Sequence, residues 1–113
     1  MTKGKVVLVP FPFDDLSAKK VRPAVCLSNP VGAHRHVILA FLTSRIPSDL
    51  HETDLVIDAS HADFSKTGLR VSSTLQVHRL MTVATSTILR ELGFLSADLL
   101  RQTDEKVKIL FRV

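Results

Sequence analysis

The chain opens on the stretch Val6-Val7-Leu8-Val9-Pro10-Phe11-Pro12-Phe13-Asp14-Asp15-Leu16, and a second apolar run follows as Arg22-Pro23-Ala24-Val25-Cys26-Leu27-Ser28. Both runs have the length and β-branched content of strands, and a polar segment with Lys19 and Lys20 separates them. The second strand begins on Arg22, so a cation has to be accommodated beside buried chain. Because a guanidinium suits phosphate binding or catalysis, this stretch bears on fold and function together.

Short strands dominate the first two-thirds of the sequence. Residues 5–9, 24–28 and 37–43 are almost continuously apolar, which is typical of strands that are covered on both faces. Residues 55–57 and 80–83 add two brief runs. Residues 69–77 alternate, so that one side of a predicted strand carries Leu69, Val71, Ser73, Leu75 and Val77.

The last third of the chain changes to a helical period. Residues 85–91 are consistent with one or two helical turns that end at Gly93. Ser96 is a good N-cap with Asp98 in the first turn, and residues 97–111 carry apolar side chains at helical spacing. The pattern predicts a mainly β fold over a single domain, 1–113, as a small barrel or strongly bent sheet with a short helix and a C-terminal helix.

Composition excludes several classes of protein. The apolar runs are far shorter than the roughly 18 residues needed to span a bilayer, and the N-terminus has no signal-peptide pattern, so we expect no membrane association. A single cysteine, Cys26, cannot form an internal disulfide and fits a reducing cytoplasm. Its place within an apolar run predicts a buried, unreactive thiol.

The net charge of +4 is unevenly distributed. Residues 1–48 hold seven basic and two acidic side chains, residues 49–63 hold five acidic and no Lys or Arg side chains, and residues 64–113 hold eight basic and four acidic ones. A basic body with one acidic segment can attract a polyanion, although the same charges also serve solubility.

Five blocks in chain order resemble the MazF/PemK family of toxins. They are the opening Gly4-Lys5-Val6-Val7-Leu8-Val9-Pro10-Phe11, then Arg22-Pro23-Ala24, Leu42-Thr43-Ser44, Gly68-Leu69 with Ser72-Ser73, and Leu92-Gly93-Phe94-Leu95-Ser96. The resemblance implies an SH3-like β-barrel that forms a homodimer, cuts single-stranded RNA without a metal or other cofactor, and is neutralised by an antitoxin protein. It also implies that Arg22 and Thr43 are the catalytic pair.

Two positions depart from the family pattern. Lys5 stands where an acid is usual, and His78-Arg79 stands where an Asp followed by Gln or a basic residue is common. We therefore consider His78 as a replacement proton-transfer group, since imidazole titrates near neutrality. Strand alternation places His78 on the face opposite Ser73 unless a bulge intervenes, and a purely structural histidine is the alternative.

The residues themselves suggest roles in RNA cleavage. Arg22 can hold two phosphate oxygens of a transition state, and the Thr43 hydroxyl can orient the phosphate or the 2′-hydroxyl. RNA contacts are expected from Lys19, Lys20, Ser44, Ser73, Arg79 and Phe13, with Arg70 as a further candidate. Phe11 and Phe13 could instead close one end of the barrel.

Two other interpretations of the sequence concern a metal site and a non-catalytic function. The histidines His34, His36, His51 and His61 do not form a convincing set of zinc ligands, so no metal site is expected. The alternative function is a non-catalytic, CcdB-like barrel that binds a protein target such as DNA gyrase.

Overall fold

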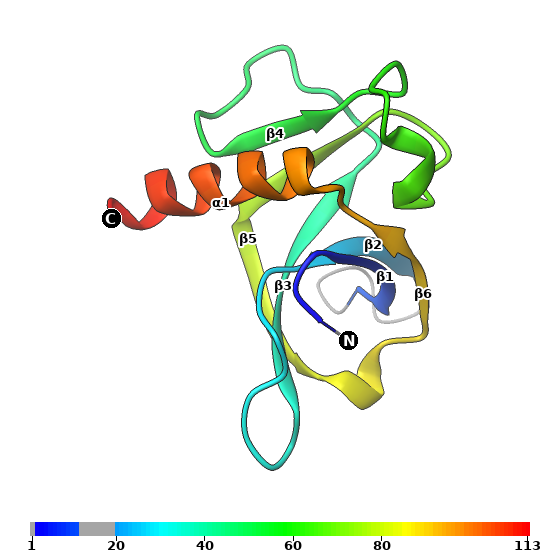
Figure 1. Ribbon diagram of the computed structural model, residues 1–113, viewed down its shortest axis with the longest axis vertical. Coiled ribbons are helices and arrows are strands. Elements are labelled where there is room, and N and C mark those ends of the chain that lie inside the picture. The colour runs from blue at the N-terminus through cyan, green and yellow to red at the C-terminus, as the bar shows by residue number, and fades with distance from the viewer. Residues whose placement is uncertain (1, 12–19) are drawn as a thin grey trace.

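The fold is a strongly curled, six-stranded antiparallel sheet with one C-terminal helix (Figure 1). The computed structural model describes residues 2–11 and 20–113. The elements are β1 (Lys5–Pro10), β2 (Val21–Cys26), β3 (His36–Thr43), β4 (Asp54–Ile57), the 3-10 turn η1 (Phe64–Thr67), β5 (Ser73–Ala84), the 3-10 turn η2 (Thr85–Thr87), β6 (Arg90–Phe94) and α1 (Ala97–Phe111). The strands run in the order β4-β5-β3-β2-β1-β6, which confirms the predicted mainly β, barrel-like architecture.

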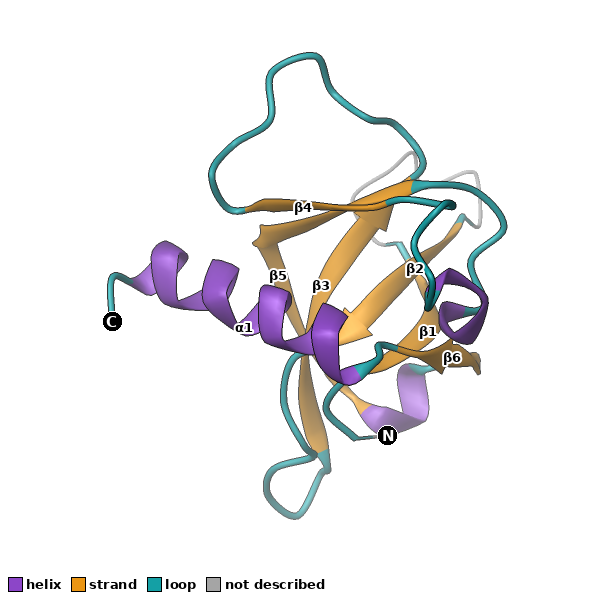
Figure 2. Ribbon diagram, turned by 45° about the horizontal axis from the view of Figure 1, so that its top comes forward, coloured by secondary structure: helices purple, strands orange, loops and turns teal. Residues whose placement is uncertain are grey.

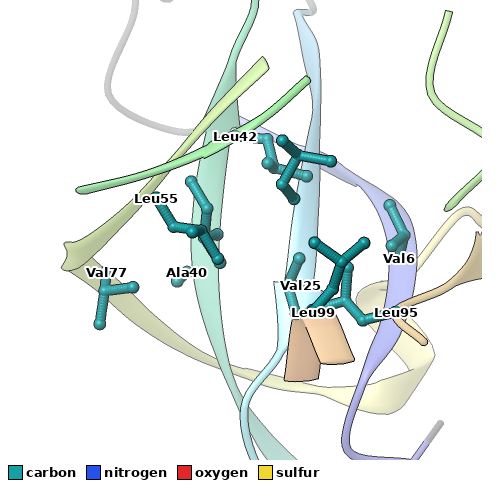
Figure 3. Close-up of a cluster of buried hydrophobic side chains, with 10 residues drawn as sticks. Val6, Val25, Ala40, Leu42, Leu55, Val77, Leu95 and Leu99 are labelled. Atoms are coloured by element: carbon teal, nitrogen blue, oxygen red, sulfur yellow. The ribbon is translucent and has the colours of Figure 1, made fainter. Parts of the chain in front are cut away.

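The continuously apolar strands are buried on both faces, as predicted. Alternate side chains of β1, β2 and β3 enter two different core clusters; in β1, Val6 belongs to one and Val7 to the other. Figure 3 shows the first cluster, in which Leu99 of α1 packs among side chains from the sheet. Cys26 lies fully buried in the second cluster, and this burial raises the pKa of its thiol to about 11.

Helix α1 begins where its sequence predicts. The Ser96 hydroxyl accepts a hydrogen bond from the Leu99 N–H at 3.4 Å, and Asp98 lies in the first turn. Arg101 and His61 both contact the Asp98 carboxylate and lower its pKa. Across the described residues, no helix is long and apolar enough to cross a membrane.

Two sequence-based predictions about local structure are wrong. Residues 85–91 form only the single turn η2 before the chain becomes β6, so Gly93 lies within a strand and does not cap a helix. Strand β5 begins at Ser73, which leaves Leu69 and Val71 in the preceding loop, with Val71 exposed. The pairing of β6 with β1 explains the first error, because this contact between distant segments overrides the weak local pattern.

The turn η1, which lies between β4 and β5 in the chain, packs against β6 at the other edge of the curled sheet (Figure 2). Gly68 follows η1 in the left-handed conformation, with φ +73°, and an added Cβ there would overlap the carbonyl of Leu92. An added Cβ at Gly93 would overlap the carbonyl of Lys66. Both glycines are therefore required by the close approach of two backbones.

We predict that Gly68→Ala destabilises the fold much more than Gly32→Ala. Both glycines have positive φ, +73° and +79°, but only Gly68 has backbone atoms where a Cβ would lie. Left-handed strain alone costs about 1 kcal/mol, and the overlap should add at least about 2 kcal/mol at Gly68. Urea unfolding measures both values, and equal losses of unfolding free energy would contradict the close-approach account.

Candidate functional site

Arg22 and Thr43 lie near the adjoining ends of β2 and β3, and both line the same two clefts. The ladder pairs Ala24 with Phe41 and Cys26 with Leu39, and the same antiparallel register continued by two residues places Arg22 opposite Thr43. Arg22 therefore shares a face with Ala24, and Thr43 shares that face with Phe41. Each residue lies two positions along its strand from a member of the second core cluster, Ala24 or Phe41.

Two adjoining clefts have Arg22 and Thr43 in common. The larger has a volume of about 450 Å³ and extends toward Gly68 and Leu92. The smaller has a volume of about 210 Å³ and extends toward Phe11. A group bound by both Arg22 and Thr43 would therefore border both cavities.

The charged side chains that line the larger cleft are all arginines. Arg45, Arg70 and Arg90 line it together with Arg22, and no described lining residue carries a carboxylate. The ion pairs between described residues do not involve Arg45, Arg70 or Arg90. Such a cleft is a strong attractor for an anionic chain.

The Thr43 hydroxyl is held in place by the chain that follows it. Its oxygen accepts a hydrogen bond from the Arg45 N–H at 3.2 Å, and the Arg45 carbonyl accepts one from the Thr74 hydroxyl at 3.0 Å. With its oxygen engaged as an acceptor, the Thr43 hydroxyl can still donate its own proton to a bound anion.

Phe11 supports two guanidinium groups at the smaller cleft. The guanidinium carbons of Arg22 and Arg79 lie 5.4 Å and 5.5 Å from the centre of the Phe11 ring, within the range of cation–π contacts. Phe41 meets the same ring edge-on at 5.0 Å. Phe11 thus joins the second core cluster to the charged groups of the site.

His78 does not lie with Arg22 and Thr43. The β3–β5 ladder pairs Ala40 with Leu80 and then Phe41 with Gln76, so residues 77–79 form the bulge that the sequence argument required. The bulge nevertheless directs the His78 Nδ1 atom to within 3.8 Å of Asp54 Oδ1. His78 lines a third cleft with Phe41, Arg79 and Leu80, and Phe41 and Arg79 also line the smaller cleft.

Asp54 is the unusual neighbour of His78. Its carboxylate is fully buried, Oδ2 accepts a hydrogen bond from the backbone N–H of His51 at 3.0 Å, and Oδ1 has no hydrogen-bond partner among the described residues. The His51 ring also packs edge-on against the His78 ring at 5.4 Å. These contacts fit the structural alternative for His78.

The other predicted site residues fall into three groups. Ser44 and Ser73 line the larger cleft, and Ser73 donates its hydroxyl proton to the Val71 carbonyl. Lys20 precedes β2 and its carbonyl accepts the Phe11 N–H, but Lys20 lines neither cleft. Phe13 and Lys19 lie outside the described residues.

The sequence analysis did not predict three polar residues that line the clefts: Arg45, Arg90 and Gln76. The sequence pointed to Arg45 only through its position two residues after Thr43. Arg90 was hidden by the wrong helical prediction for residues 85–91. No group of three or more His, Cys, Asp or Glu side chains in the described ranges is arranged to hold a metal ion.

Comparison with known proteins identifies the class to which this fold and cleft belong. The family model described as "PemK-like, MazF-like toxin of type II toxin-antitoxin system" matches residues 2–111. The chain therefore belongs to this toxin family, which confirms the resemblance read from the five sequence blocks. A comparison with curated proteins gives no match.

Several solved structures have the same fold. The Mycobacterium tuberculosis toxin MazF-mt6 is 18% identical, with a TM-score of 0.72, and the match covers 96% of this chain and 97% of that one. A MazE-MazF structure from Deinococcus radiodurans gives 20% identity and a TM-score of 0.74 over 100% and 96% of the two chains. An endoribonuclease in complex with its cognate antitoxin, from a mycobacterial species, is 13% identical with a TM-score of 0.73. The match covers 100% of this chain and 96% of that one.

Proposed function

We propose that the chain is an endoribonuclease that cuts single-stranded RNA without a metal ion, with the 2′-hydroxyl beside the scissile phosphate as nucleophile. The observation that carries the proposal is the presence of both Arg22 and Thr43 in two adjoining clefts, one of them lined by further arginines. Membership in a toxin family and the endoribonuclease named among similar folds support it.

The proposed reaction is an internal displacement at phosphorus. The 2′-oxygen forms a bond to phosphorus, the bond to the 5′-oxygen breaks, and the proton lost from the 2′-hydroxyl is balanced by one gained at the leaving 5′-oxygen. Arg22 stabilises the charge that develops on the phosphate oxygens, and the Thr43 hydroxyl donates a hydrogen bond to one of them. Arg22 remains protonated and is not the general base.

The arginine cleft supports an extended, single-stranded substrate. Arg45, Arg70 and Arg90 stand beyond the proposed reaction centre, where they can neutralise phosphates on one side of the cut. A folded duplex presents its backbone on a wider, stiffer surface than a cleft of about 450 Å³ accepts.

The proposed partners follow from the same surface. An antitoxin with acidic and apolar side chains would cover the arginine cleft and compete with RNA. The toxin-antitoxin complexes named among similar structures support such a partner. The homodimer that the sequence resemblance implies remains part of the proposal. Both proposed ligands would place the toxin in the cytoplasm.

We predict that the purified chain cuts a long single-stranded RNA at discrete sites in the presence of EDTA. Arg22→Ala should lower the rate by about 100-fold or more, because it removes the main stabilising charge from the transition state. Thr43→Val, which keeps the side-chain shape, should lower it by about tenfold. Arg101→Ala on α1 is the matched control, since Arg101 pairs with Asp98 away from both clefts.

The same assay separates this proposal from the non-catalytic alternative. Intact RNA after incubation with folded wild-type chain, with no difference in Arg22→Ala, would favour a toxin that acts by binding a protein. Cutting that requires an added divalent ion would contradict the metal-independent chemistry.

Binding measurements test the arginine cleft independently of cleavage. For an uncleavable 2′-O-methyl single strand, each of Arg45→Ala, Arg70→Ala and Arg90→Ala should reduce the slope of log affinity against log salt by about 0.7. Arg101→Ala should leave the slope unchanged. Three unchanged slopes would show that RNA does not follow this cleft.

His78 as a proton-transfer group remains a prediction with its own test. If His78 acts as base or acid, the cleavage rate of the wild type depends on pH near neutrality and His78→Ala abolishes that dependence. If its contacts with Asp54 and His51 are structural, His78→Ala keeps the pH profile of the wild type and loses only stability.

A further inference from the structure

Thr74 is a fully buried polar residue that lies close to the site but outside its clefts. In the two ladders of β5, Thr74 lies opposite Thr43 of β3 on one side and opposite Val56 of β4 on the other. Its side chain is closed to solvent, and Thr74 lines none of the three clefts described above. Any effect of Thr74 on the reaction must therefore pass through a neighbouring residue.

Two hydrogen bonds in series join Thr74 to Thr43. The Thr74 hydroxyl donates to the Arg45 carbonyl at 3.0 Å, and the Arg45 N–H donates to the Thr43 hydroxyl oxygen at 3.2 Å. The second bond closes a turn of the kind that Ser and Thr side chains form with the backbone two residues further on. Among the described residues, these two bonds are the ones that hold the backbone of Arg45. Thr74 therefore anchors the turn that engages the Thr43 hydroxyl.

The segment that follows Thr43 needs such an anchor. Residues 44–46 are exposed, so burial does little to fix their backbone. The Thr74 hydroxyl ties this exposed segment to the buried side of β5. A Thr43 side chain without the Arg45 N–H beside it would be free to change rotamer and to turn its proton away from the clefts.

We propose that Thr74 is a positioning residue, which holds the Arg45 backbone so that the Thr43 hydroxyl donates its proton toward the scissile phosphate. This inference rests on the proposed endoribonuclease function. It adds to the reaction a residue that touches neither the RNA nor the reacting atoms. A hydroxyl aligned before the reaction begins stabilises the transition state without a further loss of freedom.

The experiment compares Thr74→Val, which removes the hydroxyl but keeps the branched shape, with Thr74→Ser, which keeps the hydroxyl. Thr74→Val should lower kcat for RNA cleavage by about threefold to tenfold and leave KM unchanged, and Thr74→Ser should restore most of the lost rate. Thr103→Val is the matched control, because Thr103 is equally buried and its hydroxyl donates to the Leu99 carbonyl within α1, outside the clefts. This control should cut RNA like the wild type.

A double-mutant cycle shows whether Thr74 acts through Thr43. In the Thr43→Val background, Thr74→Val should have almost no further effect on the rate, because the hydroxyl that it positions is already gone. Full additivity of the two losses would overturn the inference. An equal loss of rate in Thr103→Val would also overturn it, and so would a Thr74→Ser variant as slow as Thr74→Val.

Amide hydrogen exchange at Arg45 tests the same link without RNA cleavage. Thr74→Val should speed exchange of the Arg45 N–H by about threefold or more, whereas Thr74→Ser and Thr103→Val should leave it unchanged. Unchanged exchange in a folded Thr74→Val variant would overturn the inference. If the wild type cuts no RNA, the proposed function fails, and faster exchange in Thr74→Val alone would still support the link from Thr74 to Thr43.

Discussion

The register between β2 and β3 is the constraint on which the site depends. A slip of one residue would move Arg22 to the opposite face from Thr43, because side chains alternate along a strand. The slip is opposed by burial on both faces: Ala24 and Phe41 belong to one core cluster, and Val25 and Ala40 belong to the other. Packing of apolar side chains therefore determines where the two polar groups meet.

A second long-range contact shapes the cavity around that pair. The close approach of η1 and β6, which leaves no room for a Cβ at Gly68 or Gly93, brings the loop with Arg70 near the strand that begins at Arg90. Both arginines then line one cleft although twenty positions separate them. The bulge at residues 77–79 places His78 beside Asp54, whereas Arg79 lines both the smaller cleft and the cleft of His78.

The sequence was informative where local physics decides the outcome. Continuous apolar runs predicted β1, β2 and β3, and Ser96 with the helical period predicted α1. It failed at β6, because Arg90-Glu91-Leu92-Gly93-Phe94 has weak alternation and becomes a strand only by pairing with β1. Arg22 and Thr43 were accessible through the family resemblance, whereas Arg90 and Gln76 required the three-dimensional pairing.

The most direct test of the account is a single 2′-deoxy substitution on the 5′ side of a mapped cut in a synthetic RNA. In the proposed mechanism, the 2′-hydroxyl itself attacks a phosphate held by Arg22 and Thr43. Removing that one oxygen should therefore abolish cutting at that bond, and the unmodified RNA should yield a 2′,3′-cyclic phosphate and a 5′-hydroxyl. Undiminished cutting of the substituted strand would show that another nucleophile acts, and the proposed mechanism would be wrong.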